Sequence, residues 1–231
     1  MKTSMLALAL LAACASTSTT APVTPIASSA AITSDVAIDL AARRVRVLDW
    51  LHAYREAGVY PTDVRGMPAS VFVDSNGTRC PMAELIYRSG REDLVAAVAQ
   101  EANGVRLADV HDGPLHDWML ASGLTRDEIN MIQGAMNLDI GWLELETEVP
   151  QILAGRAQVR GKLEIAEIAL RDNTAAALAI AAKAVPGHHT IDALATTPVH
   201  GAVVPAAAIA KAQPATGILR RRGRTFGAFR N

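Results

Sequence analysis

The sequence predicts a mainly α-helical domain with one small β-hairpin, flanked by two segments without regular structure. Apolar residues recur at helical spacing over most of residues 34–185, and a single Asn-Gly pair follows a short β-branched run. Half of the 231 residues are hydrophobic, only 4% are aromatic, and the net charge is −1. Without its flanking segments, the chain has the length of one ordinary domain.

The first helix is expected over residues 34–57. Ser34 is a favourable N-cap residue, and Gly58 suits the left-handed position that follows a helix. An apolar stripe at helical spacing predicts its buried face. This stripe consists of Leu40, Val47, Leu48, Leu51 and Tyr54.

The clearest β signal lies at residues 71–80, where a β-branched and aromatic run precedes the Asn-Gly pair. Such a pair favours a tight turn, so we expect a hairpin. Pro81 suits the first position of the next helix, which we expect over residues 81–87. Cys80 would then occupy the N-cap of that helix.

Two capping boxes predict the starts of further helices. One pairs Ser89 with Glu92 and the other pairs Thr125 with Glu128. A short strand is expected between them, over residues 105–110.

The carboxyl-terminal half predicts two more helices, over residues 151–171 and 174–185. Residues 143–149 alternate in a way that leaves strand and helix both open. A Pro-Gly pair ends the last helix, and residues 186–231 are expected to lack regular structure. The folded domain would therefore cover residues 34–185.

The amino terminus carries an export signal. Lys2 precedes an apolar run, Met5 to Ala13, that is too short to cross a bilayer. The run ends in Leu11-Ala12-Ala13-Cys14, which resembles the lipobox of bacterial lipoprotein signal peptides. The resemblance implies that residues 1–13 are removed and that Cys14 receives a lipid that holds the protein on a membrane.

The resemblance also implies a location in the cell envelope. Ala15 stands where an aspartate would mark inner-membrane retention, so the expected location is the outer membrane, facing the periplasm, in a host that has one. Residues 14–33 are small, polar and proline-containing, which predicts a flexible tether. The alternative is an ordinary secretory signal cleaved near Ala13 or Ala15.

Several short motifs lie between residues 72 and 133. They are Phe72-Val73-Asp74, Gly77-Thr78, Cys80, Ser89-Gly90, Asn103, Gly123-Leu124-Thr125 and Ile132-Gln133. Together they resemble a stretch of uncharacterised exported bacterial proteins. This resemblance implies no activity and transfers no functional residue.

Cys80 is the candidate nucleophile of the chain. A helix amino terminus stabilises a thiolate, and His111 could act as its base, with Asp112, Asp109 or Asn103 orienting the histidine. The protein would then be a cysteine-dependent hydrolase or transferase acting on peptide or peptidoglycan. The alternative is that Cys80 is a small core residue.

A divalent-metal site is a third hypothesis, with His111, His116 and Asp117 as ligands. Their spacing matches no established metal signature. The alternative is that these residues belong to a turn and to the exposed side of a helix. No other cofactor is expected.

The carboxyl terminus is basic, and no acidic residue follows Asp192. Arginines bind phosphate and carboxylate groups, and in an exported protein the available anions belong to the envelope, so no nucleic acid is expected as a partner. The alternative is a solubilising end. The arginines concerned are Arg220, Arg221, Arg222, Arg224 and Arg230.

The leading hypothesis from the sequence is a non-catalytic envelope lipoprotein that binds an anionic component of its surroundings. Export and anchoring signals are clear, whereas no complete catalytic constellation is present. The cysteine-dependent enzyme and the metal-binding module are the alternatives.

Overall fold

The computed structural model describes residues 29–138, 148–187 and 190–211. Within these ranges the chain forms nine α-helices and one short 3-10 helix, with no β-strand, so the mainly helical prediction is confirmed. The elements are α1 (Ser29–Ala57), α2 (Pro81–Arg88), α3 (Glu92–Ala102), η1 (Leu107–Asp109), α4 (Gly113–Ala121), α5 (Arg126–Gly134), α6 (Glu148–Asp172), α7 (Thr174–Ala184), α8 (Ile191–Ala195) and α9 (Ala206–Lys211).

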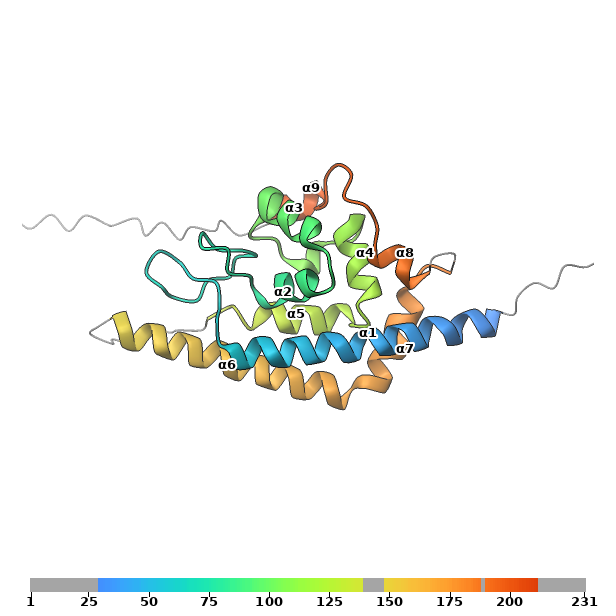
Figure 1. Cartoon of the computed structure of the whole chain (residues 1–231), viewed down its shortest axis with the longest axis horizontal. Coiled ribbons are helices and arrows are strands. Elements are labelled where there is room, and N and C mark those ends of the chain that lie inside the picture. Colours follow the sequence, from blue (N-terminus) through green and yellow to red (C-terminus); the bar gives the residue numbers. More distant parts are fainter. Residues whose placement is uncertain (1–28, 139–147, 188–189, 212–231) are drawn as a thin grey trace, which may run out of the picture.

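Two long helices, α1 and α6, run antiparallel along one side of the molecule; α7 packs beside them, and most of the other short helices pack above them (Figure 1). Ion pairs join the exposed edges of the two long helices. Arg160 contacts Glu56 at 2.6 Å, and one end of Arg171 lies 3.8 Å from Asp49. The long pair therefore forms a base on which the short helices are assembled.

The hydrophobic core lies between this base and the short helices. Its centre includes Leu51, Phe72, Leu85, Leu115, Ile129, Val159 and Leu163, each at most 2% exposed. A smaller cluster, at the amino-terminal half of α1, joins Leu40 to Ala121, Ala181, Ile191 and Leu194. Because both clusters use residues from distant positions of the chain, the described residues fold as a single unit.

Arg44, on α1, connects this helix to α5, α6 and α7 inside the core. Its side chain is only 1% exposed, and its guanidinium donates to both carboxylate oxygens of Glu128, at 2.9 and 2.5 Å. The same guanidinium donates to the backbone oxygens of Gly123 and Leu170. A buried charge is tolerated only when it is paired and hydrogen-bonded, and Arg44 meets both conditions.

The first helix ends as predicted, at Ala57, and Gly58 adopts the left-handed conformation with φ of 62°. Its start is earlier than predicted. The helix begins at Ser29, so Ser34 is not its N-cap, and residues 29–33 are helical instead of belonging to the tether. No glycine or proline interrupts this alanine-containing segment, which lets the helix extend.

Of the two predicted capping boxes, one is confirmed and the other is wrong. The Thr125 box is confirmed, because the Thr125 hydroxyl accepts from the backbone of Glu128 and the Glu128 side chain accepts in return. The Ser89 box is wrong. The Ser89 hydroxyl donates to the carbonyl of Ile86 at the end of α2, and accepts from the indole of Trp118, so it is not available to cap α3.

The expected hairpin is reduced to one antiparallel bridge between Val73 and Arg79. The loop also differs from the expected tight turn. The backbone oxygen of Asp74 accepts from the amide of Gly77, and the amide of Asp74 donates to the backbone oxygen of Thr78. The loop therefore contains three residues, and only Gly77 has a positive φ, of 78°.

Side-chain amides replace the strand pairing that the sequence predicts. The carboxamide of Asn103 makes two 2.8 Å bonds to the backbone of Val73, and that of Gln133 bonds the backbone of Val105 and Leu107. The strand predicted over residues 105–110 is therefore wrong; this segment contains the 3-10 helix η1. A carboxamide presents donor and acceptor groups side by side, as a strand neighbour would.

The helices predicted over residues 151–171 and 174–185 correspond to α6 and α7. Beyond them, where no structure is expected from the sequence, α8 and α9 pack back onto the domain. Arg91 donates to the backbone oxygens of Ala195 and Thr197, at 2.9 Å each. Glu101 accepts from the backbone of Val203 and Val204, two residues that are fully buried. Folded structure therefore continues past residue 185.

Candidate functional site

Cys80 occupies the N-cap of α2, as the sequence predicts. Its sulfur accepts a 3.4 Å hydrogen bond from the amide of Ala83, and the residue is 3% exposed. The small space beside it, about 10 Å³, is lined by residues that include Phe72, Asn103 and Met136, and by no histidine. Cys80 thus lies in the core and away from solvent.

The electrostatics of this position oppose an activated thiol. Burial raises the pKa of the Cys80 thiol to about 11, although the hydrogen bonds from nearby backbone amides lower it. A nucleophilic cysteine needs a pKa shift in the other direction. The carboxamide of Asn103 is also occupied by the backbone of Val73, so it does not orient a histidine.

His111 and Asp112, proposed as partners of Cys80, and the proposed metal ligands lie around the start of α4. His111 and Asp112 are exposed, whereas His116 and Asp117 are partly buried on the helix itself. Over the described ranges, no group of three or more His, Cys, Asp or Glu side chains is arranged to hold a metal ion. The structure therefore supplies no geometry for either alternative hypothesis.

We expect Cys80 to react slowly with iodoacetamide in the folded protein. With its pKa raised from 9.0 to about 11, the thiol has a thiolate fraction about 100-fold lower at neutral pH, and burial excludes the reagent further. A full-length Cys14→Ser variant leaves Cys80 as the only thiol, so alkylation can be followed by mass with and without urea. Rapid alkylation of the folded protein at neutral pH would revive the hydrolase hypothesis.

Other residues named from the sequence lie outside the described residues. These are Cys14 and the basic residues Arg220, Arg221, Arg222, Arg224 and Arg230.

Three arginines converge on a pocket at the junction of α1, α2 and α4. Arg43 and Arg46 come from α1, and Arg88 comes from the last turn of α2. The pocket has a volume of about 120 Å³. We call it the arginine pocket, and its lining consists of Arg43, Arg46, Val47, Trp50, Arg88, Ser89, Trp118, Ala121 and Ser122.

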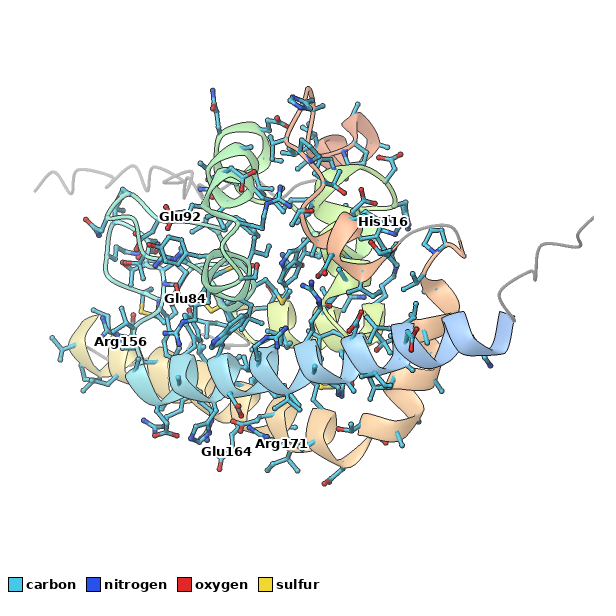
Figure 2. All side chains as sticks on the ribbon, turned by 45° about the vertical axis from the view of Figure 1, so that its right-hand side comes forward. Glu84, Glu92, His116, Arg156, Glu164 and Arg171 are labelled. Carbon is cyan, nitrogen blue, oxygen red and sulfur yellow. The ribbon has the colours of Figure 1, made fainter. Side chains whose placement is uncertain are left out.

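The three arginines differ in their partners. Arg43 pairs with Asp192 of α8, and Arg88 pairs at 2.8 Å with Glu84, which is labelled in Figure 2. Arg46 is exposed and has no hydrogen-bonding or acidic partner among the residues that the structure describes. The pocket therefore contains one guanidinium whose charge is not compensated by a neighbouring acid.

Two tryptophans complete the pocket. The indole of Trp118 is almost fully buried and donates to the Ser89 hydroxyl at 2.8 Å, which fixes both groups. Trp50 is partly exposed and packs against the core. The site thus combines cationic groups with rigid aromatic walls.

Part of the arginine pocket is predictable from the sequence, although none of its residues is among the candidate site residues named from the sequence. Arg43, Arg46 and Trp50 are spaced by three and four positions, so they form one stripe along α1. The contributions of Arg88 and Trp118 depend on how α2 and α4 pack on that stripe, which local patterns do not reveal.

Comparison with protein families, with curated proteins and with solved structures gives no match to this chain. The similarity of residues 72–133 to exported proteins therefore stays a prediction. None of the helices in the described ranges combines the length and the hydropathy that crossing a membrane requires.

Proposed function

We propose that the protein is a non-catalytic, lipid-anchored module of the bacterial envelope whose folded domain binds an anionic group in the arginine pocket. The observation that carries this proposal is Arg46, an exposed guanidinium without an acidic partner in the described ranges, which lines a pocket with two further arginines. Guanidinium groups bind carboxylate and phosphate through paired N–H donors, and these charge-assisted bonds are stronger than neutral ones.

The size of the pocket limits the ligand to a small group. A volume of about 120 Å³ is well below the roughly 300–1,000 Å³ of sites for drug-sized molecules. A single phosphate or carboxylate group fits this limit, either free or as the exposed end of a larger envelope component. Arg43 and Arg88 line the same pocket, but each is paired with an acid, so Arg46 supplies the unpaired charge.

The lipid anchor is the second element of the proposal and rests on the lipobox resemblance at Cys14. An anchored domain meets the anionic groups of the envelope at high local concentration, so moderate affinity suffices for binding. Mass analysis of the mature protein tests the anchor. We expect an amino-terminal cysteine carrying lipid, and an unmodified terminus elsewhere would contradict it.

Binding of inorganic phosphate to the full-length protein, followed by calorimetric titration, tests the pocket. The Arg46→Gln variant should bind at least tenfold more weakly, because a hydrogen bond to a charged group contributes about 1.5–3 kcal/mol. The interaction should also weaken as salt is raised, since the site is open to solvent.

Arg156→Gln is the matched control for this experiment. Arg156, labelled in Figure 2, is an exposed arginine on α6 that forms no hydrogen bond or ion pair within the described ranges, and it does not line the pocket. Its replacement removes the same charge from the protein and should leave phosphate affinity unchanged. Equal losses in both variants would mean that phosphate responds only to overall charge, and the proposal would fail.

A further inference from the structure

A second pocket lies between α4, α5 and α7, and it shares no residue with the arginine pocket. Its volume is about 250 Å³, and most of its lining is aliphatic. One wall is Ile180 of α7, which is 59% exposed although it is a large apolar residue. This wall therefore presents apolar surface that a ligand could remove from water.

The polar side of the lining comes from three residues, His116, Thr125 and Arg126. Arg126 is held in place because one of its terminal nitrogens donates to the backbone oxygens of Ala108 and Val110, at 3.0 and 2.8 Å. Arg126 has no acidic partner among the residues that the structure describes. Its position is fixed while its charge remains available to a ligand.

His116 does not add a second full charge at neutral pH. Partial burial lowers the pKa of His116, and the nearby Arg126 lowers it further, while Asp117 and Asp112 act in the opposite direction. The imidazole is therefore a neutral hydrogen-bonding group beside a single fixed cation. A pocket with aliphatic walls and one cationic group suits a ligand that has an aliphatic chain and one anionic group.

We infer that this pocket binds a short-chain acyl carboxylate, with the carboxylate on Arg126 and the chain along the aliphatic walls of α4 and α7. The guanidinium accommodates a carboxylate through paired donors. Because the volume lies just below the usual range for drug-sized ligands, the pocket suits a short chain and not a complete phospholipid. This inference does not depend on the proposed function of the arginine pocket.

Calorimetric titration of the full-length protein with butanoate, hexanoate, octanoate and decanoate tests the inference. Each added methylene should strengthen binding about fourfold, until the pocket is filled and the gain stops. Octanol has the chain of octanoate without its charge, so it should bind at least tenfold more weakly. Binding of octanol as tight as that of octanoate would overturn the assignment of Arg126 as the recognition group.

Two substitutions on the exposed surface of α7 locate the site without disturbing the core. Ala184 lines the pocket and is exposed, so Ala184→Trp should fill the space and weaken octanoate binding at least tenfold. Ala179 is exposed on the same helix but does not line the pocket, and Ala179→Trp should bind octanoate like the unmodified protein. Unchanged binding in Ala184→Trp would overturn the inference.

The Arg46→Gln variant separates this site from the arginine pocket. It should lose affinity for phosphate while it keeps its affinity for octanoate, since Arg46 does not line the acyl pocket. If Arg46→Gln loses octanoate binding to the same extent, octanoate binds in the arginine pocket, and the inference is wrong while the proposed function stands.

Discussion

Replacing Glu128 with glutamine should lower the free energy of unfolding by about 3 kcal/mol. Glu128 is the only acid that pairs with the buried guanidinium of Arg44 in the described ranges. Glutamine has nearly the same shape and can still accept from Thr125 as the third residue of a capping box. The loss would therefore come mainly from the uncompensated charge of Arg44, which cannot reach water.

Glu84→Gln is the matched control for this substitution. Glu84 also pairs with arginines, at 2.6 Å from Arg79 and 2.8 Å from Arg88, but those arginines are 28% and 35% exposed. Water screens such pairs, so the loss should stay below about 1 kcal/mol. Urea unfolding monitored by circular dichroism gives both values. A similar loss in the two variants would show that burial of Arg44 has no special cost.

A second substitution rescues the first. In an Arg44→Met, Glu128→Gln double variant, no charge is left buried, and methionine retains much of the volume of the arginine stem. We expect this variant to be more stable than Glu128→Gln alone. If it is less stable, the packing and the backbone bonds of Arg44 to Gly123 and Leu170 outweigh the charge.

Gly123→Ala should be the other strongly destabilising substitution, with a loss of about 2–4 kcal/mol. Gly123 has a φ of 77°, and a Cβ atom there would lie 2.4 Å from the backbone oxygen of Leu40 and 3.0 Å from Cβ of Arg44. The alanine would therefore force α1 away from α4 and α5. Neither contact can be relieved by rotating a flexible side chain.

Gly90→Ala separates the cost of the positive φ from the cost of the steric clash. Gly90 has a similar φ of 86°, but a Cβ atom there meets nothing within 4 Å. Its replacement should cost only the backbone strain, about 1–2 kcal/mol. The same urea unfolding measurement compares the two variants. If Gly123→Ala costs no more than Gly90→Ala, the close approach of α1 to Gly123 does not limit stability.

Local patterns predict the elements whose ends are set by neighbouring residues. Gly58 ends α1, Pro81 starts α2 behind Cys80, and the Thr125 box starts α5, because in each case the deciding contacts lie within one helical turn. The stripe along α1 likewise predicts its buried face. These features of the fold follow from propensity and capping alone.

Contacts between distant residues decide the remaining features. Asn103 and Gln133 use their side chains where the sequence predicts strand pairing, and nothing in their neighbourhoods indicates this role. The side chains of Arg91 and Glu101 hold α8 and the segment before α9. Each forms hydrogen bonds to backbone atoms about one hundred positions away. In the sequence these segments are polar or alanine-rich and have no strong periodic pattern.

The candidate site likewise depends partly on local patterns, which the sequence reveals, and partly on contacts between distant residues, which it does not. The N-cap position of Cys80 is predicted correctly, but its burial depends on the packing of α2 against distant residues, and burial determines the pKa of the thiol. The arginine pocket is assembled by α1, α2 and α4 together. Arg43 and Arg46 lie off the buried stripe of α1, where an arginine is ordinarily a solvated surface residue.

The most direct test of the proposed function follows the indole N–H signals of Trp50 and Trp118 by NMR during titration with inorganic phosphate. Both rings line the arginine pocket, and the indole of Trp118 is bonded to Ser89 in the same lining. We predict that both signals shift with one saturating curve, and that chloride at equal ionic strength leaves them in place. Signals that do not move, or that move equally with chloride, would contradict anion binding in this pocket.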